Sequence, residues 1–180
     1  MNERRFHRDP DRLRAPERLA RLEVDRVVDL CLDGIAVQDV LDVGSGTGVF
    51  AEAFAKRGIH ATGIDVNPDM VAAATGQVPG ARFVTAPAEA PPFPDKAFDV
   101  VFLGHVLHEA DDAVGALKEA KRLARQRVVV LEWPYREEEM GPPLHHRLSN
   151  DQVEQFARQA GLTQVEVLPL THMVAFRMDA

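Results

Sequence analysis

The 180-residue chain has the length of one domain and can bury a hydrophobic core. Its formal net charge of −7 and pI of about 5.5 disfavour a nucleic-acid surface, because such a surface needs clustered lysine and arginine. The single cysteine, Cys31, excludes an internal disulfide and a multi-cysteine metal site. The N-terminal stretch MNERRFHRDP lacks a signal-type apolar core and no apolar run is long enough for a membrane span, so we expect a cytoplasmic protein.

The first predicted elements are an arm and a helix. Residues 1–15 are charged and contain Pro10, which predicts a flexible arm preceding a single domain over residues 16–180. Pro16 suits the first turn of a helix, and the apolar spacing continues this helix to about Leu32.

Strands and helices then alternate along the chain. The strands are predicted at residues 38–43, 60–65, 81–86, 98–104, 127–132, 163–170 and 172–178. The helices between them are predicted at residues 47–58, from Asn67-Pro68 onward, 111–125, and from the Ser149-x-x-Gln152 capping box to Gly161. Alternation implies right-handed crossovers and a parallel sheet, whereas the link between the last two strands is short enough only for an antiparallel hairpin. The sequence therefore predicts a Rossmann-like α/β fold, with a seven-stranded, mostly parallel sheet, helices on both faces and one reversed C-terminal edge strand.

A glycine-rich turn joins the first strand to the next helix. Residues 40–48 read VLDVGSGTG. Glycines allow positive φ and close backbone approach, and a helix start offers unpaired N–H groups. In open α/β sheets, ligands bind at the carboxyl ends of the strands. We therefore expect a negative or strongly polar ligand group against Gly44, Ser45, Gly46, Thr47 and Gly48.

Two acidic residues indicate which ligand this turn holds. Asp42 would repel a diphosphate but suits an ammonium group. Val49 occupies the place of the third glycine of a dinucleotide motif, which disfavours an NAD-dependent oxidoreductase. Asp65 ends the second strand, where an acidic side chain accepts from ribose hydroxyls. A ligand with an ammonium group, a carboxylate and a free ribose is S-adenosylmethionine.

Three blocks carry a resemblance to a known family. VLDVGSGTG, GIDVNPDM and AEAPPFPDKAFDVVFLGHVLHE occur in this order, and the resemblance covers about residues 38–133. They resemble the class I S-adenosylmethionine-dependent methyltransferases, in the style of the ubiquinone/menaquinone-biosynthesis C-methyltransferases. The resemblance implies methyl transfer to a small-molecule acceptor, with S-adenosylhomocysteine as product. We expect no metal site, because HVLHE lacks the H-E-x-x-H order and no third clustered ligand is evident, and we expect a monomer or homodimer. A non-catalytic S-adenosylmethionine-binding domain is the alternative.

The resemblance also assigns cofactor contacts by position. It implies that Gly44, Gly46 and Gly48 line the methionine part, with Asp42 directed toward the ammonium group. Asp65 would hold the ribose. The further cofactor contacts that it implies are Val66 on the adenine, Ala88 and Glu89 in the adenine loop, and Gly104 and His105 beside the sulfonium. Family members often carry Gly-Asp-Ala-Glu where this chain has Ala86-Pro87-Ala88-Glu89, so Pro87 replaces an aspartate that accepts from the adenine amino group.

The acceptor side is predicted from residues that follow two later strands. His105, His108 and Glu109 are candidates for proton transfer if the acceptor requires a base, with helix-turn packing as the alternative for the histidines. Trp133 and Tyr135 are candidate substrate contacts or packing residues. We expect the loop MGPPLHHRL to face the substrate. By family analogy, Phe6 and His7 of the arm could cover the site as a lid.

Overall fold

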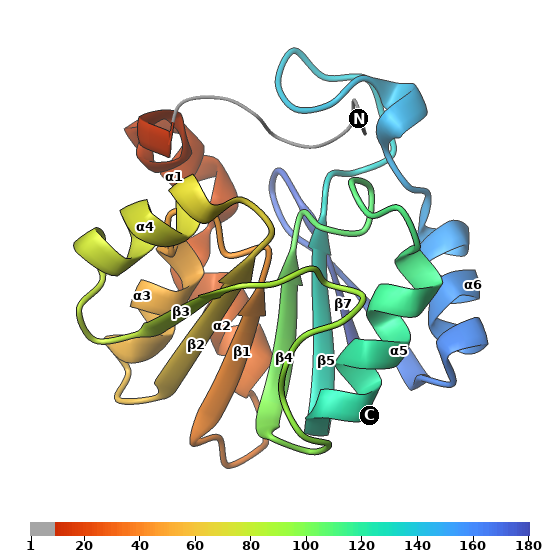
Figure 1. The fold of residues 1–180 in the computed structure, drawn as a ribbon. Coiled ribbons are helices and arrows are strands. Elements are labelled where there is room, and N and C mark those ends of the chain that lie inside the picture. Colours follow the sequence, from red (N-terminus) through yellow and green to blue (C-terminus); the bar gives the residue numbers. More distant parts are fainter. Residues whose placement is uncertain (1–9) are drawn as a thin grey trace.

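The computed structural model describes residues 10–180, which form a seven-stranded sheet in the order β3-β2-β1-β4-β5-β7-β6 (Figure 1). The strands are β1 (Asp39–Val43), β2 (His60–Asp65), β3 (Arg82–Thr85), β4 (Phe98–Gly104), β5 (Ala124–Glu132), β6 (Thr163–Pro169) and β7 (Val174–Asp179). The helices are η1 (Pro10–Arg14), α1 (Pro16–Leu22), α2 (Val24–Leu32), α3 (Val49–Ala55), α4 (Pro68–Gln77), α5 (Ala113–Leu123), η2 (Leu144–His146) and α6 (Asn150–Ala160). None of the helices in this part of the chain is long and apolar enough to cross a membrane.

The pairing of the strands confirms the predicted Rossmann-like fold class. Strands β3, β2, β1, β4 and β5 pair in parallel, with Val40 aligned to Ala61 on one side and to Val100 on the other. Strand β7 is antiparallel to both of its neighbours, β5 and β6. The prediction that the reversed strand lies at the edge is wrong, because β6 takes that position. Four of the six residues of β7 are buried, whereas β6 has no buried residue, so the hairpin places its more apolar strand inside the sheet.

Helices cover both faces of this sheet (Figure 1). Helices α2 and α3 pack together in one apolar layer that includes Val27, Val28 and Phe54. Helices α5 and α6 contribute Leu117 and Val153 to the layer on the other face. The link between β3 and β4 contains no helix, so the alternation is interrupted there, and residues 86–97 cross the sheet as a loop.

The predicted helix from Pro16 to Leu32 is broken in two. Glu23 adopts a left-handed φ of 46° between α1 and α2, and its carboxylate accepts hydrogen bonds from Thr171 N (2.7 Å) and Thr171 Oγ1 (3.1 Å). This tertiary contact outweighs the helix propensity of glutamate. Of the predicted arm, residues 10–14 form η1, whereas Phe6 and His7 lie outside the described residues.

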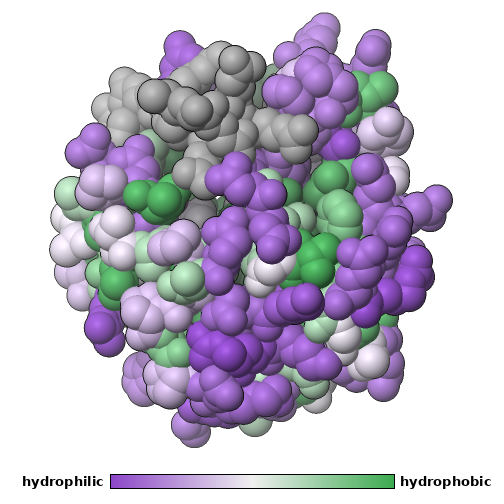
Figure 2. Space-filling model, turned by 45° about the vertical axis from the view of Figure 1, so that its right-hand side comes forward, coloured by the Kyte–Doolittle hydropathy of each residue, from purple (hydrophilic) through white to green (hydrophobic). Residues whose placement is uncertain are grey.

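The large hydrophobic side chains that remain exposed mark one edge of the sheet. Hydrophilic residues predominate on the face in Figure 2, with apolar side chains in small patches. Among the described residues, the exposed large hydrophobic side chains are Val66, Tyr135 and Met140. Val66 follows β2, and the other two follow β5, so all three lie beyond the carboxyl ends of parallel strands. This is the edge at which open α/β sheets bind ligands.

Candidate functional site

A cavity of about 910 Å³ opens at this edge, between the carboxyl ends of the parallel strands and the segment formed by η1 and α1. Nearly all predicted cofactor contacts line it. They are Asp42, Gly44, Ser45, Gly46, Thr47, Asp65, Val66, Ala88, Glu89, Gly104 and His105. Gly48 is not among the lining residues, because a Cβ there would lie 2.8 Å from the Phe83 ring, so its bareness serves packing.

The glycine turn presents a bare backbone to the cavity. Gly44 and Gly46 adopt φ values of 67° and 51°, which favour glycine. A Cβ on Gly46 would lie 2.9 Å from Leu13, and one on Gly44 would clash with Val106. The hydroxyl oxygens of Ser45 and Thr47 are buried and have no hydrogen-bond partner among residues 10–180. The turn therefore offers both space and unused polar groups to a ligand.

Asp65 is fixed by the backbone of two turns. Its Oδ2 accepts from Gly46 N and its Oδ1 accepts from Asn67 N, each at 2.9 Å. Burial raises the pKa of Asp65, and the backbone hydrogen bonds from Asn67, Gly46 and Val66 offset part of this increase. The carboxylate is therefore held rigidly at the cavity wall, with lone pairs left for a further donor.

Asp42 both lines the cavity and caps a helix. The side chain lines the cavity, but its Oδ2 also accepts from Ala51 N in the first turn of α3 at 3.1 Å. Burial raises the pKa of Asp42 to about 8, the hydrogen bond from Ala51 lowers it, and the charge of Asp65 raises it further. The carboxyl group therefore caps α3 whether or not it also contacts a ligand.

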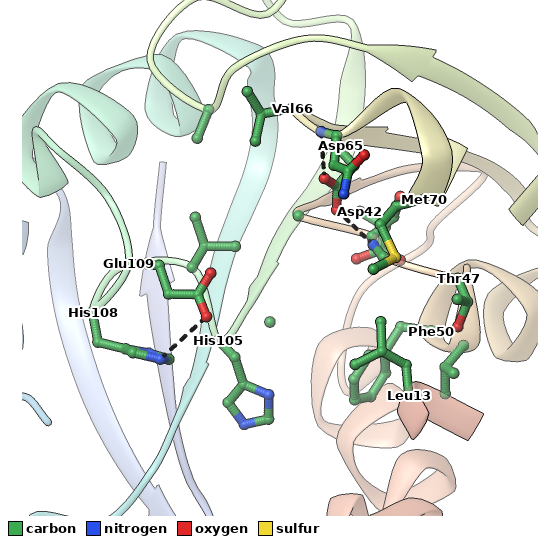
Figure 3. A pocket seen from close by; sticks show the side chains of 18 of the residues that line it. Leu13, Asp42, Thr47, Phe50, Asp65, Val66, Met70, His105, His108 and Glu109 are labelled. Atoms are coloured by element: carbon green, nitrogen blue, oxygen red, sulfur yellow. Dashed lines mark hydrogen bonds and ion pairs between the residues drawn. The ribbon is translucent and has the colours of Figure 1, made fainter. Parts of the chain in front are cut away.

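The facing wall of the cavity comes from the turn after β4. Figure 3 shows His105, His108 and Glu109 on one side of the cavity and Asp42 and Asp65 on the other. Asp42 belongs to β1, which pairs with β4, whereas Asp65 ends β2 on the other side of β1. A ligand between the two groups would contact an acidic, glycine-rich half and a histidine-containing half.

His105 is held in a strained and apolar position. Its φ is 61°, and its ring stacks on Trp133 with centroids 5.1 Å apart. Its Nε2 lies 3.3 Å from the sulfur of Met173. Burial, with smaller contributions from Arg18 and His108, holds the pKa of His105 well below its ordinary value. The imidazole is therefore neutral at physiological pH, and packing against Trp133 accounts for its orientation.

His108 is buried between two carboxylates. Its Nδ1 lies 2.7 Å from Glu132 Oε2, and its Nε2 lies 3.7 Å from Glu109 Oε1 (Figure 3 shows the latter pair). Burial lowers the pKa of His108, but the charge and hydrogen bond of Glu132, together with Glu109, raise it overall. Since Glu132 is the acceptor, Nδ1 of His108 carries a proton. The other ring nitrogen, Nε2, faces Glu109.

Sequence reasoning did not identify Glu132 as a residue of the site, although its place at the end of an apolar strand could have indicated it. It ends the otherwise apolar run VVVLE of β5 and is 1% exposed. A carboxylate buried at the carboxyl end of a strand requires a partner. The sequence gives no indication that this partner is His108.

The N-terminal segment also contributes residues that sequence reasoning missed. Arg14 donates to Glu52 Oε2 at 2.7 Å and to the carbonyl of Thr47 at 2.8 Å, which ties η1 to α3 and to the glycine turn. Leu13 and Arg18 line the cavity. Arginines in a charged arm are usually solvated, so only the fold reveals their position.

A loop after β5 closes the cavity on the side of His105. Met140, Gly141, Pro142 and Pro143 line the cavity, as expected for the MGPPLHHRL segment. Arg147 holds this loop from inside, with a side chain that is 1% exposed. Its guanidinium donates to the carbonyl oxygens of Pro134, Arg136, Met140 and Pro142, at 2.8 to 3.0 Å.

The two aromatic residues after β5 that were predicted as substrate contacts lie in different places. Trp133 lines the cavity, between His105 and the guanidinium of Arg147, which lies 5.5 Å from the ring centroid. Tyr135 is exposed and borders a different hollow, beside α6 and the β6–β7 turn. Among the described residues, no group of three histidine, cysteine, aspartate or glutamate side chains could hold a metal ion.

Comparison with known proteins gives a match over the central part of the chain. A family described as "Methyltransferase domain" matches residues 41–131, which run from β1 to β5 and include the glycine turn, Asp65 and the HVLHE turn. A demethylmenaquinone methyltransferase of Chlorobaculum tepidum is 36% identical over 95 residues, or 52% of this chain and 39% of that protein. A malonyl-[acyl-carrier protein] O-methyltransferase of Serratia marcescens is 32% identical over 94 residues, or 52% and 37%. The matched part of the chain thus spans less than half the length of these curated relatives.

A solved structure resembles nearly the whole fold. The crystal structure of a SAM dependent methyltransferase from Aquifex aeolicus has a TM-score of 0.84 and covers 97% of this chain and 99% of that chain. The identity is 23%, so this likeness supports the fold alone.

Proposed function

The chain belongs to the methyltransferase-domain family, and from this premise we propose that it transfers a methyl group from S-adenosylmethionine to a small-molecule acceptor. The family match covers the residues that line the glycine-rich half of the cavity. Because the matched part is only a fraction of the curated relatives, their acceptors do not carry over to this chain.

One observation carries the proposal: the carboxylate of Asp65 accepts a hydrogen bond from the backbone N–H of Gly46, at the edge of the glycine-rich turn. A rigid carboxylate facing a cavity suits a pair of ribose hydroxyls, which donate to it. The hydroxyls of Ser45 and Thr47, which have no partner in the described part of the chain, lie in the same turn and offer polar contacts to an amino-acid group. The residues present therefore fit the cofactor.

Each wall residue then has a role in binding. Asp65 would hold the ribose, and the exposed side chain of Val66 would pack on the adenine. Asp42 would face the ammonium group, whose charge favours the ionised carboxylate. Ala88 and Glu89 would border the adenine where Pro87 replaces the usual aspartate. Gly104 and His105 would border the sulfonium.

The chemistry requires little from the protein beyond alignment and water exclusion. When bound, S-adenosylmethionine supplies a methyl group on a positively charged sulfur that leaves as a neutral thioether. The loop held by Arg147 and the segment tied down by Arg14 enclose the cavity and limit access of water. An in-line displacement at this site needs no nucleophilic side chain of the protein.

His108 is the candidate base for an acceptor that must lose a proton. Its Nδ1 is occupied by Glu132, so Nε2 can accept a proton when the imidazole is neutral. Its pKa lies above its ordinary value, so the neutral form becomes dominant only as the pH rises through that pKa. Glu109 borders the same space and can receive or share the proton. We place His105 in packing against Trp133 rather than in proton transfer.

Isothermal titration calorimetry with S-adenosylhomocysteine, S-adenosylmethionine and NAD tests the cofactor. We expect micromolar binding of the first two, and binding of NAD weaker by about 100-fold or more, because Asp42 opposes a diphosphate. Equal or preferred binding of NAD would favour an oxidoreductase.

Catalysis is tested separately from binding. The protein is incubated with S-adenosylmethionine carrying a labelled methyl group and with pools of quinols, phenols, amines and organic acids, and labelled products are sought. Labelled product supports an enzyme, whereas tight cofactor binding without product from any pool supports a non-catalytic binding domain. We further propose a cytoplasmic protein that acts as a monomer or homodimer, which size-exclusion chromatography with light scattering can test.

A further inference from the structure

Arg18 of α1 is a cationic side chain of the cavity with an unused donor. Its Nε is buried and has no hydrogen-bond partner among residues 10–180. Burial lowers the pKa of Arg18, and the nearby charge of Glu109 only partly offsets this. Arg18 in turn contributes to the low pKa of His105. Arg18 lines the cavity together with His105 and Glu109 of the histidine-containing half.

Two other arginines of this region show what a structural guanidinium looks like in this fold. The Nε of Arg14 also has no partner among residues 10–180, but its Nη1 and Nη2 donate to Glu52 and to the carbonyl of Thr47. Arg147 uses Nε, Nη1 and Nη2, and donates to four backbone carbonyls. Arg18 lines the same cavity, but its Nε has no acceptor within the described residues 10–180. Buried polar groups in native proteins are nearly always paired, and an unpaired donor at a cavity wall suggests a ligand that completes the pairing.

The charges around the cavity are arranged by element. Arg12, Arg18 and Arg21 all line it from the N-terminal segment. Two of the acidic lining residues, Asp42 and Asp65, belong to the carboxyl-terminal halves of β1 and β2 and lie across the cavity from His108 and Glu109 (Figure 3). An anionic group under the N-terminal segment is therefore favoured over a cationic one.

We propose that Arg18 binds a carboxylate of the methyl acceptor, so that the acceptor is an organic acid; this inference rests on the proposed methyl transfer. A guanidinium matches a carboxylate through two parallel N–H donors, and Nε can be one of them. A carboxylate suits the position better than a doubly charged phosphate, because Glu109 lies close enough to repel added negative charge. The neutral His105 beside Arg18 adds no competing positive charge.

The test uses benzoate and benzamide, which have the same shape but differ in charge. Both are titrated into the full chain by calorimetry, with and without saturating S-adenosylhomocysteine. We expect the wild type to bind benzoate about 10-fold more tightly than benzamide. Arg18→Gln should abolish this preference and Arg18→Lys should retain part of it, because lysine keeps the charge but not the fork. Arg26→Gln, an equivalent change on the exposed side of α2, should leave the preference intact.

The same variants distinguish the two carboxylates that could reach Arg18. If Arg18 binds the acceptor, Arg18→Gln changes the affinity for S-adenosylhomocysteine by less than about twofold. If that affinity falls about 10-fold or more, while the affinity for 5′-methylthioadenosine, which lacks the amino-acid part, is unchanged, Arg18 binds the cofactor instead and the inference is wrong. Equal binding of benzoate and benzamide by the wild type, or a preference that persists in Arg18→Gln, also overturns it. Failure of the wild type to bind S-adenosylhomocysteine contradicts the proposed function, and the benzoate titration without it still tests Arg18.

Discussion

Glu132 and His108, which are 24 positions apart, form a buried contact of 2.7 Å between Oε2 and Nδ1 at the carboxyl edge of the sheet. The backbone N–H of His108 also donates to Glu132 Oε1 at 3.3 Å. Both contacts join the end of β5 to the turn after β4. These contacts hold the HVLHE turn in place. The same carboxylate raises the pKa of His108.

The first prediction concerns the pKa of His108. Glu132→Gln removes the negative charge that opposes the effect of burial, so the pKa of His108 should fall below the wild-type value. Titration of the histidine ring protons by NMR measures this pKa without any acceptor. Glu154→Gln, on the outer part of α6, should not change it. An unaltered His108 pKa in Glu132→Gln would show that the contact does not control protonation.

The same pair predicts how stability depends on pH. A histidine with a raised pKa in the folded state stabilises the fold fully below its unfolded pKa, and this contribution is lost as the pH rises through the folded pKa. Glu132→Gln should therefore lower the free energy of unfolding by about 2 kcal/mol at pH 6, and by less at pH 9. Urea denaturation at the two pH values measures the difference. An equal loss at both would point to packing rather than charge.

A second prediction concerns Asp65. Asp65→Asn replaces one acceptor oxygen by a donor, which conflicts with Gly46 N and with a ribose hydroxyl. Loss of charge-assisted hydrogen bonds should weaken S-adenosylhomocysteine binding by about 10- to 100-fold in calorimetry. Asp69→Asn, at an exposed carboxylate in the first turn of α4, provides the matched control. Similar affinities in the two variants would remove Asp65 from the cofactor site.

Much of the sheet could be predicted because its signals are local. The bounds of β2 and β4 agree with the predicted ranges, and Asn67 caps α4 as its sequence indicates. The break at Glu23 could not be predicted, because it depends on Thr171 at the far end of the chain. The inner position of β7 depends on competition between two strands for burial, which neither strand reveals alone.

The glycine-rich half of the candidate site could be predicted from the sequence, whereas the prediction of the histidine-containing half was incomplete. Asp42, Gly46 and Asp65 are close in sequence to recognisable turns, and the fold brings them to one cavity. Arg18 reaches that cavity, and Glu132 reaches His108 at the cavity wall, only through long-range packing that no sequence spacing marks. Tyr135 shows the converse, since a residue at the expected edge points to a different hollow.

Asp42 gives a third prediction, on alkaline destabilisation. Its pKa of about 8 in the folded protein exceeds that of an unfolded aspartate, so its contribution to stability is lost as the pH rises through 8. The wild type should lose roughly 2 kcal/mol of unfolding free energy between pH 6 and pH 9, and Asp42→Asn should lose much less. Urea denaturation across this range tests it, with Asp25→Asn at an exposed site as control. Parallel profiles for wild type and Asp42→Asn would contradict it.

A fourth prediction concerns the loop after β5. Arg147→Met removes the donors of four backbone carbonyls and leaves these acceptors buried or newly hydrated. We expect a loss of about 3 kcal/mol in unfolding free energy and faster amide hydrogen exchange in residues 134–142. Arg158→Met, on the exposed face of α6, should cause neither change. Unaltered exchange in the loop would show that its prolines alone hold it.

The last prediction separates space from backbone conformation in the glycine turn. Gly46→Ala and Gly58→Ala both place an alanine at positive φ, 51° and 77°, and each should cost about 1 kcal/mol of stability. Only at Gly46 would the new Cβ reach Leu13, at 2.9 Å, and enter the cavity, whereas at Gly58 it meets nothing within 4 Å. Calorimetry should therefore show S-adenosylhomocysteine affinity reduced by about 10-fold or more in Gly46→Ala and unchanged in Gly58→Ala. If both variants bind like the wild type, the bare backbone at Gly46 serves the turn and not the ligand.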